Sequence, residues 1–329
     1  MPNEPLTLAD VMQARSRIAH LINNTPVIES PAISQVTGGN IFLKLENTQQ
    51  TTSFKLRGAA NRLLNLSAEQ RARGVITVSS GNHGKAVAYV AQKFGIPAVI
   101  GLGVHVPKNK VRDIRAYGAE TLIVGQNWEE TCAQAATIQQ QRGLAYIDPF
   151  DDPLIIAGQG TLALEVLDRY PYMDTFVVPL SGGGLIGGVA LAAKAINPRI
   201  RVIGVSQMDG AAMYLSLRAG RVVDIIETPS LADALLGGIG TDNRYTFELC
   251  RSLLDDTVLV SEDEIAAAMV FLLDRHHLVV EGAGAVAVAA LLNQRVTPGK
   301  HTLAVVSGGS VDTALLMRLA DQHLPDANR

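Results

Sequence analysis

Short apolar runs alternate with longer segments of helical periodicity along most of the chain. The runs that predict strands lie at 41–45, 75–78, 98–100, 120–124, 176–180, 201–205 and 302–306. The segments that predict helices lie at 6–21, 55–66, 85–94, 108–117, 128–142, 158–168, 185–196, 211–218, 262–276 and 283–293. Strands that alternate with helices form βαβ units around a parallel sheet, so the pattern predicts an α/β fold.

The same pattern predicts two lobes. Residues 74–150 contain a compact run of alternating strands and helices, and the loop 148–153 is rich in proline and aspartate. We therefore expect a smaller lobe at 74–150 and a larger lobe made of 1–73 and 151–329. A chain of 329 residues that is 47% hydrophobic is long enough to bury two such cores.

Charge and cysteine content narrow the class of protein. The net charge is -3, with 28 basic and 31 acidic residues mixed along the chain, so no nucleic-acid surface is expected. Cys132 and Cys250 lie far apart and fit no metal-ligand spacing, which is typical of a reducing cytoplasm. No run of about 18 apolar residues and no export signal occurs, so we expect neither a membrane span nor secretion.

The first candidate for chemistry is Lys55, in the segment Thr51–Ala59. Ser53 is a candidate N-cap, which would put Lys55 in the first turn of a helix. The helix dipole disfavours a cation there, so the pKa of the amine should fall, as imine chemistry requires. Taken alone, the segment favours a solvated surface lysine.

The loop 181–184 follows a predicted strand and precedes a predicted helix, as phosphate-binding loops do. Gly182, Gly184 and Gly187 also have the spacing of a dinucleotide-binding loop. That motif expects an acidic residue after the next strand, where this chain has Ser206, so a dinucleotide site is disfavoured. The alternative for this loop alone is that its glycines allow a helix and a strand to pack closely.

Two more loops lie at predicted strand ends. Residues 79–84 offer hydroxyl, amide and backbone N–H groups that suit a carboxylate, and residues 307–309 form the last loop. Ligands of open parallel sheets bind at the carboxyl ends of the strands, so we expect these loops to meet near Lys55.

These motifs resemble those of the fold-type II pyridoxal-phosphate enzymes, in the serine/threonine dehydratase and serine racemase group. The matching segments are Lys44–Asn47, Ser53–Ala59, Ser80–His83, Ser181–Leu185 and Ser307–Gly309. The resemblance extends from about residue 6 to about residue 315. It implies a two-lobed fold similar to the tryptophan synthase β chain, and a homodimer. Residues 231–240 and 242–244 most resemble dehydratases encoded with hydroxyectoine-degradation enzymes.

The resemblance also implies a role for each matching residue. Lys55 would bind pyridoxal 5′-phosphate covalently and then remove the substrate Cα proton. The cofactor contacts that it implies are Phe54 on the pyridine ring, Asn82 at the 3′-oxygen, Ser181, Gly182, Gly183, Gly184 and Leu185 at the phosphate, Ser307 at the pyridine nitrogen, and Glu281 nearby. The substrate carboxylate would contact Ser53, Ser80, Gly81, Asn82 and His83. Ser80 also matches the residue that protonates the opposite face in the racemase.

The implied reaction is β-elimination from a small β-hydroxy amino acid such as threonine, serine or a 3-hydroxyaspartate, which yields a 2-oxo acid and ammonia. The alternatives are an amino-acid racemase and a non-catalytic binding protein that keeps the fold. Ser206, Gly210 and Ala212 stand where the racemase supplies its metal ligands, two of them carboxylates, so we expect no divalent-metal site. The chain also ends soon after residue 310, so no C-terminal regulatory domain is expected.

Overall fold

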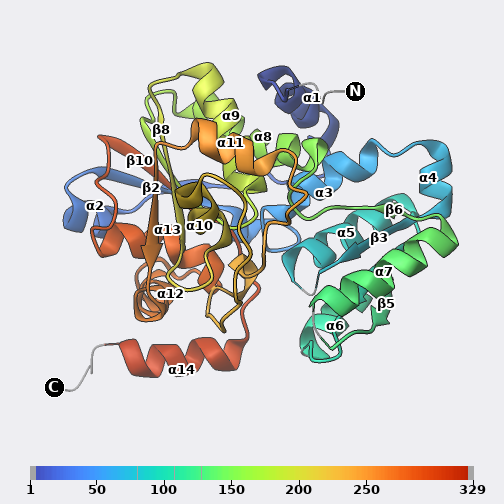
Figure 1. Cartoon of the computed structure of the whole chain (residues 1–329). Coiled ribbons are helices and arrows are strands. Elements are labelled where there is room, and N and C mark those ends of the chain that lie inside the picture. Colours follow the sequence, from blue (N-terminus) through green and yellow to red (C-terminus); the bar gives the residue numbers. More distant parts are fainter. Residues whose placement is uncertain (1–4, 80, 107, 127, 325–329) are drawn as a thin grey trace.

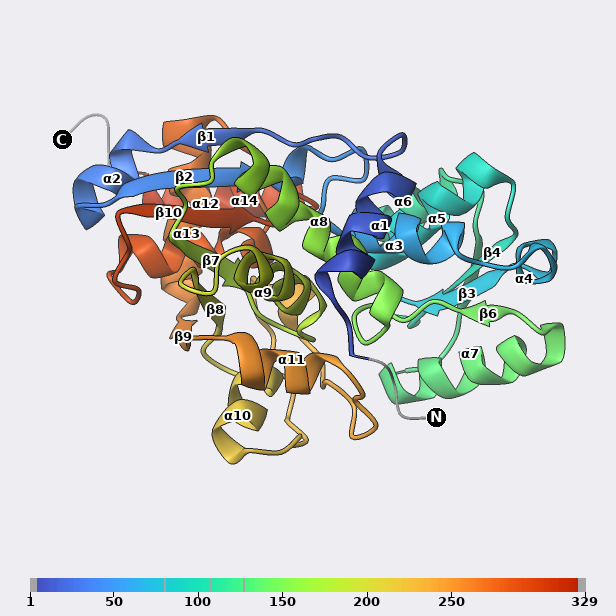
Figure 2. The ribbon, with the colours of Figure 1, turned by 90° about the horizontal axis from the view of Figure 1, so that it is seen from above.

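The computed structural model describes residues 5–79, 81–106, 108–126 and 128–324, and it contains two sheets (Figures 1 and 2). The larger sheet has the strand order β1 (Val27–Glu29), β2 (Asn40–Leu45), β10 (His301–Val306), β7 (Thr175–Pro179), β8 (Arg201–Gln207) and β9 (Asp256–Val260). Strand β1 is antiparallel to β2, and the other neighbouring strands are parallel.

Both faces of the larger sheet are covered by helices. Helices α12 (Glu262–His276) and α13 (Gly282–Leu292) share a core cluster with Ile203 on one face. Helices α8 (Pro153–Arg169) and α9 (Gly184–Ile196) share another with Val202 on the other face. Successive residues of a strand point to opposite faces, so a strand that is covered on both sides reads as a continuous apolar run.

The smaller sheet is entirely parallel, with the order β5 (Glu120–Ile123), β4 (Ala98–Leu102), β3 (Val75–Val78) and β6 (Ala145–Tyr146). One face packs against α3 (Lys55–Leu64), α5 (Asn82–Phe94) and α6 (Lys108–Arg115). Helix α7 (Trp128–Arg142) covers the other face. The predicted α/β fold, with two mostly parallel sheets flanked by helices, is therefore confirmed.

The sequence pattern missed the strands β1, β6 and β9 and most of the short or peripheral helices. The remaining elements are α1 (Leu8–Ile18), α2 (Pro31–Thr37), η1 (Glu46–Thr48), α4 (Ala68–Arg73), α10 (Ala212–Ala219), η2 (Asp233–Leu235), α11 (Thr246–Leu253) and α14 (Thr313–His323). Of these, only α1 and α10 were predicted. None of the helices in the described ranges is long and apolar enough to cross a membrane.

Helix α8 begins five residues before its predicted start at 158. The Asp152 carboxylate accepts hydrogen bonds from the N–H groups of Leu154 and Ile155, and Pro153 occupies the first turn. Proline suits a first turn because that turn needs no N–H donor. The prediction treated this proline as part of a loop, although Asp152 and Pro153 together form a helix start.

Helices α3 and α8 lie between the two sheets (Figure 1). They approach so closely that a Cβ atom added to Gly158 would lie 2.7 Å from the Cα atom of Gly58. This contact places the first turn of α3, and with it Lys55, between the lobes. The exact lobe boundaries, 74 and 150, stay a prediction.

Candidate active site

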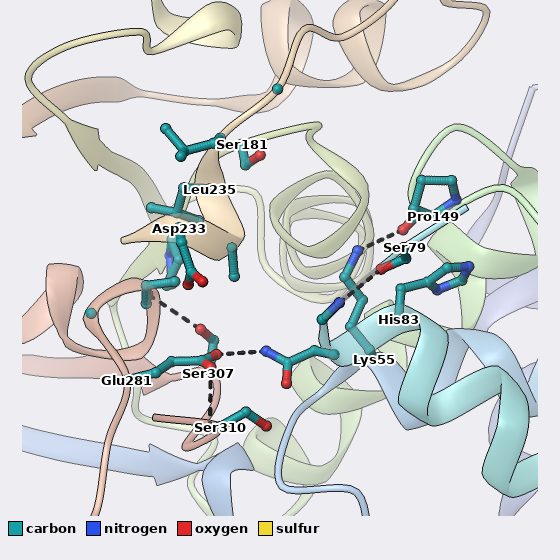
Figure 3. Close-up of a pocket in the computed structure, with 18 of the residues that line it drawn as sticks. Lys55, Ser79, His83, Pro149, Ser181, Asp233, Leu235, Glu281, Ser307 and Ser310 are labelled. Atoms are coloured by element: carbon teal, nitrogen blue, oxygen red, sulfur yellow. Dashed lines mark hydrogen bonds between the residues drawn. The ribbon is translucent and has the colours of Figure 1, made fainter. Parts of the chain in front are cut away.

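A cavity of about 1120 Å³ lies between the two sheets and has Lys55 in its wall. The loops that follow β2, β3, β7 and β10 all line it, as expected for the carboxyl ends of parallel strands. In Figure 3, Lys55 and His83 lie on one side of the cavity, while Ser181, Glu281 and Ser307 lie on the other.

Lys55 is the first residue of α3, and its ammonium group donates a 2.7 Å hydrogen bond to the carbonyl oxygen of Pro149. Burial lowers the pKa of Lys55 to about 8, although the charge of Asp148 acts in the opposite direction. The predicted direction of the shift is therefore right, and the main cause of the shift is loss of hydration on burial. A pKa of about 8 leaves part of the amine neutral, and thus nucleophilic, near neutral pH.

The predicted Ser53 cap is wrong. Helix α3 has Phe54 at its N-cap position and no side-chain cap hydrogen bond. Ser53 instead pairs through its backbone with Gly308, and the N–H of Phe54 donates to the carbonyl oxygen of Ser307 at 3.1 Å. The start of α3 is thus fixed by the loop after β10, and the Ser53 hydroxyl has no partner among the described residues.

A buried ion-pair network anchors α3 two residues after Lys55. The guanidinium of Arg57 contacts both oxygens of Glu46 at 2.8 Å and both oxygens of Glu165 at 2.6 and 2.8 Å. It also donates to the hydroxyl of Thr161 at 3.1 Å, so all five guanidinium N–H groups are used. Lys44 supplies the second cation, 2.7 Å from Glu165. The network is neutral in sum and joins β2, α3 and α8.

The loop 181–184 follows β7 directly, as predicted. Gly183 has φ +87°, a left-handed conformation that favours glycine, and Gly184 begins α9. Within the described part of the chain, no protein acceptor contacts the N–H groups of Gly182 and Gly183. Free N–H groups at the start of a helix form an anion site, so this loop fits a phosphate group.

Asn82 and Glu281 meet across the cavity, although 199 residues separate them in the sequence. The Asn82 amide donates to one oxygen of Glu281 at 2.6 Å, and the N–H of Ser310 donates to the other at 3.1 Å. Burial raises the pKa of Glu281 to about 7, and the nearby charge of Asp233 acts in the same direction. The Asn82 carbonyl oxygen is buried with no described partner, so it is available to a ligand.

The side chain of His83 has a defined tautomer. Its Nε2 atom lies 3.2 Å from the carbonyl oxygen of Ile147, which can only accept, so Nε2 carries the proton. Burial and, to a smaller extent, the charge of Lys55 lower the pKa of His83 to about 3, so the ring stays neutral. Nδ1 is then a buried acceptor without a described partner, and an acceptor cannot bind a carboxylate.

The structure brings the predicted residues together around one cavity. Phe54, Lys55, Gly81, Asn82, His83, Ser181, Gly182, Gly183, Gly184, Leu185, Glu281 and Ser307 all line it. The hydroxyl of Ser307 contacts the carbonyl oxygen of Ala283 at 3.3 Å. Ser53 is buried beside the cavity rather than part of its wall. Ser80 lies outside the described residues, so its predicted roles stay predictions.

Other residues of the cavity were not predicted. Lys85 donates to the hydroxyl of Thr52 at 3.2 Å, and the 2.6 Å ion pair between Lys110 and Asp233 joins the smaller sheet's helix α6 to η2. Lys85 follows Asn82 by three residues on α5, so helical spacing alone could have identified it. Phe150 and its neighbours had no such signal, because only the tertiary fold brings them to the glycine loop.

The donor set fits pyridoxal 5′-phosphate. It combines an amine of lowered pKa, unpaired N–H groups at a helix start, and buried polar atoms of Ser53, Asn82 and His83 that lack described partners. Among the described residues, no group of three or more His, Cys, Asp or Glu is placed to hold a metal ion. The expectation of no divalent-metal site stays a prediction.

Comparison with known proteins defines the class. Residues 18–308 match the model of the family described as "Pyridoxal-phosphate dependent enzyme", so the chain belongs to this family of pyridoxal-phosphate enzymes. It is 42% identical to the L-threonine ammonia-lyase of Thermotoga maritima, over 98% of this chain and 80% of the relative. It is 46% identical to a putative threonine dehydratase of Sinorhizobium fredii, over 94% of both chains.

A solved structure extends this likeness to the fold. The maize serine racemase superimposes with a TM-score of 0.91 and 35% sequence identity, over 98% of each chain. The family, the fold and the cofactor that the motifs predicted are thereby confirmed.

Proposed function

We propose that this protein eliminates the β-hydroxyl group from a small β-hydroxy amino acid and releases a 2-oxo acid and ammonia. One observation carries the proposal: Lys55, with a pKa of about 8, faces a cavity whose other side carries a glycine loop with free N–H groups. The relatives named L-threonine ammonia-lyase and threonine dehydratase support the reaction type. The candidate substrates are threonine, serine and 3-hydroxyaspartate.

The proposed cofactor contacts follow from the positions of the cavity residues. Lys55 holds the cofactor covalently, residues 181–185 bind its phosphate, and Phe54 packs against its ring. Asn82, Glu281 and Ser307 surround the remaining polar atoms. When bound, pyridoxal 5′-phosphate supplies an electron sink that stabilises negative charge at the substrate Cα.

Lys55 also carries the proposed proton transfers. Once the substrate amine has replaced Lys55 on the cofactor, the freed neutral amine of Lys55 takes the proton from the substrate Cα. The resulting ammonium can return a proton to the departing hydroxyl, which leaves as water. His83 cannot act as this acid, because its pKa of about 3 leaves Nδ1 without a proton. The released enamine then hydrolyses to the 2-oxo acid and ammonia.

We propose that backbone groups hold the substrate carboxylate. Helix α5 begins at Asn82, so the N–H groups of residues 81–83 lie at a helix start, where anions are favoured. The hydroxyl of Ser53 is buried without a described partner and is the neighbouring side-chain donor. The His83 ring is not a carboxylate donor in this proposal, because its Nδ1 atom can only accept.

The test measures 2-oxo acid and ammonia released from threonine, serine and each stereoisomer of 3-hydroxyaspartate. We expect equal amounts of both products from at least one substrate. Lys55→Ala should abolish the visible absorbance of the bound cofactor and reduce turnover by at least about 10³-fold. Turnover that survives Lys55→Ala would contradict the mechanism.

The racemase remains the second candidate because of the close structural match to maize serine racemase. Chiral analysis of the same reactions separates the two, since racemisation yields a D-amino acid without ammonia. The homodimer, the cytoplasmic location and the hydroxyectoine-related branch stay predictions.

A further inference from the structure

The glycine loop 181–184 is held from one side by the segment that precedes α8. A Cβ atom on Gly184 would lie 2.8 Å from the carbonyl oxygen of Phe150, and one on Gly182 would collide with the Phe150 ring. These two glycines therefore leave the space that Phe150 fills. The preceding residue, Pro149, accepts the hydrogen bond from Lys55, so one short segment contacts both Lys55 and the loop.

Helices α10 and α11 hold the loop from another side. A Cβ atom on Gly183 would lie 2.8 Å from Met213, 2.9 Å from Thr246 and 3.0 Å from the sulfur of Cys250. Met213 belongs to α10, whereas Thr246 and Cys250 belong to α11, which also contacts α9 (Figure 2). The conformation of the loop thus depends on where α11 begins.

Asp151 connects these two sides. One oxygen of its carboxylate accepts a 2.6 Å hydrogen bond from the N–H of Arg244. The other accepts from the N–H groups of Tyr245 at 3.0 Å and Thr246 at 2.9 Å. Tyr245, the N-cap residue of α11, makes no side-chain cap of its own, so a carboxylate more than 90 residues away in sequence caps this helix.

We propose that Asp151 is a positioning residue for the cofactor phosphate: by joining Phe150 to the start of α11, it fixes the two supports of the glycine loop. This inference rests on the proposed assignment of residues 181–185 to the phosphate. A loop held in its binding conformation before the ligand arrives loses less entropy on binding. Asp151 therefore strengthens binding at the phosphate end of the cofactor without touching it.

The experiment compares the affinities of the apo protein for pyridoxal 5′-phosphate and for pyridoxal, which lacks the phosphate. Both are titrated by absorbance, without any amino-acid substrate. Asp151→Ala should weaken binding of pyridoxal 5′-phosphate by about tenfold or more, since it removes hydrogen bonds to a charged group. Binding of pyridoxal should stay within about twofold of the wild-type value.

Asp151→Asn tests the inference if the alanine variant does not fold. An asparagine can keep the acceptor for Tyr245 and Thr246 but not the one for Arg244, so the loss should be smaller and again confined to pyridoxal 5′-phosphate. Asp152→Asn is the matched control. Its carboxylate contacts Arg62 at 2.8 Å and caps α8, so the ratio of the two affinities should not change.

Equal weakening of both ligands in the Asp151 variants, or the same selective loss in Asp152→Asn, would overturn the inference. Because the titrations need no turnover, a failure of the elimination assay would leave their result standing. If the wild-type protein binds both ligands equally well, residues 181–185 do not bind the phosphate, and the inference about Asp151 is wrong as well.

Discussion

At the scale of single residues, burial rather than sequence neighbourhood sets the chemistry of the site. Burial lowers the pKa of Lys55 and His83 and raises that of Glu281. Desolvation disfavours whichever form is charged, so amines and imidazoles become weaker bases while carboxyl groups become weaker acids. The cavity thus provides an amine that is partly neutral near neutral pH, a neutral imidazole and a carboxyl group with a pKa of about 7.

Glu281→Gln should change how stability depends on pH. The pKa of Glu281 is about 7 in the folded protein and about 4.5 in the unfolded chain, so the folded state binds this proton more tightly. Stability is therefore lost as pH rises from about 4.5 to about 7. The melting temperature of the apo variant minus that of the apo wild type should therefore be larger at about pH 8 than at about pH 5.

Thermal unfolding of the apo proteins at the two pH values checks this prediction. Asp233 and Lys110 also act on the charge of Glu281 and are left unchanged. Ser307→Ala removes a group from the same cavity that does not titrate, so its effect should be the same at both pH values. If the effect of Glu281→Gln on the melting temperature does not vary with pH, burial does not raise the pKa of this carboxyl group.

At the scale of elements, α3 is held at its start by contacts that lie far apart in the sequence. The loop after β10 pairs with Ser53 and Phe54, and the Arg57 network ties the first turn to β2 and α8. Removing one member of this network would leave its partner charge buried and unpaired, which costs several kcal/mol. The charges of the network therefore stabilise the fold only together. The network fixes the position of Lys55.

Arg57→Met should lower the free energy of unfolding by about 3–5 kcal/mol, because it leaves Glu46 and Glu165 buried with a single cation. Urea unfolding of the apo protein measures this loss. Arg15→Met is the matched control, since Arg15 forms an exposed ion pair with Asp168 and should cost at most about 1 kcal/mol. Similar losses in the two variants would mean that the buried network adds nothing specific.

At the scale of the whole molecule, the contact between α3 and α8 joins the two lobes. The cavity lies beside this contact, between the two sheets. Gly58 and Gly158 allow the two helix backbones to touch. Lys55 begins α3, while α8 starts beside Pro149 and Phe150. One helix–helix contact therefore sets both the lobe arrangement and the distance from Lys55 to the glycine loop.

Gly158→Ala should destabilise the protein by about 1–3 kcal/mol, because the added methyl group would overlap the backbone of Arg57 and Gly58. Thermal or urea unfolding measures the change. Gly187→Ala in α9 is the control: its Cβ atom would meet only Leu249, at an ordinary contact distance of 3.5 Å. That variant should match or slightly exceed wild-type stability, and a Gly158→Ala variant that behaves like it would contradict the close contact.

The fold class, the cofactor motifs and most of the cavity residues could be predicted from the sequence alone. These features depend on local periodicity and on the rule that loops after parallel strands gather at one edge of a sheet. Short peripheral elements such as β1, α4 and α11 were missed, because runs of three to eight residues are too short to give a clear periodic pattern. Their positions are set by the surfaces against which they pack.

The structure was needed to show how the motif residues act. It showed that burial sets the pKa of Lys55, that Ser53 is no cap, and that the tautomer of His83 leaves it an acceptor. It also joined Asp151 to a helix start more than 90 residues away. Desolvation and long-range hydrogen bonds depend on the groups that surround a residue in three dimensions. The spacing of residues along the sequence does not show which groups those are.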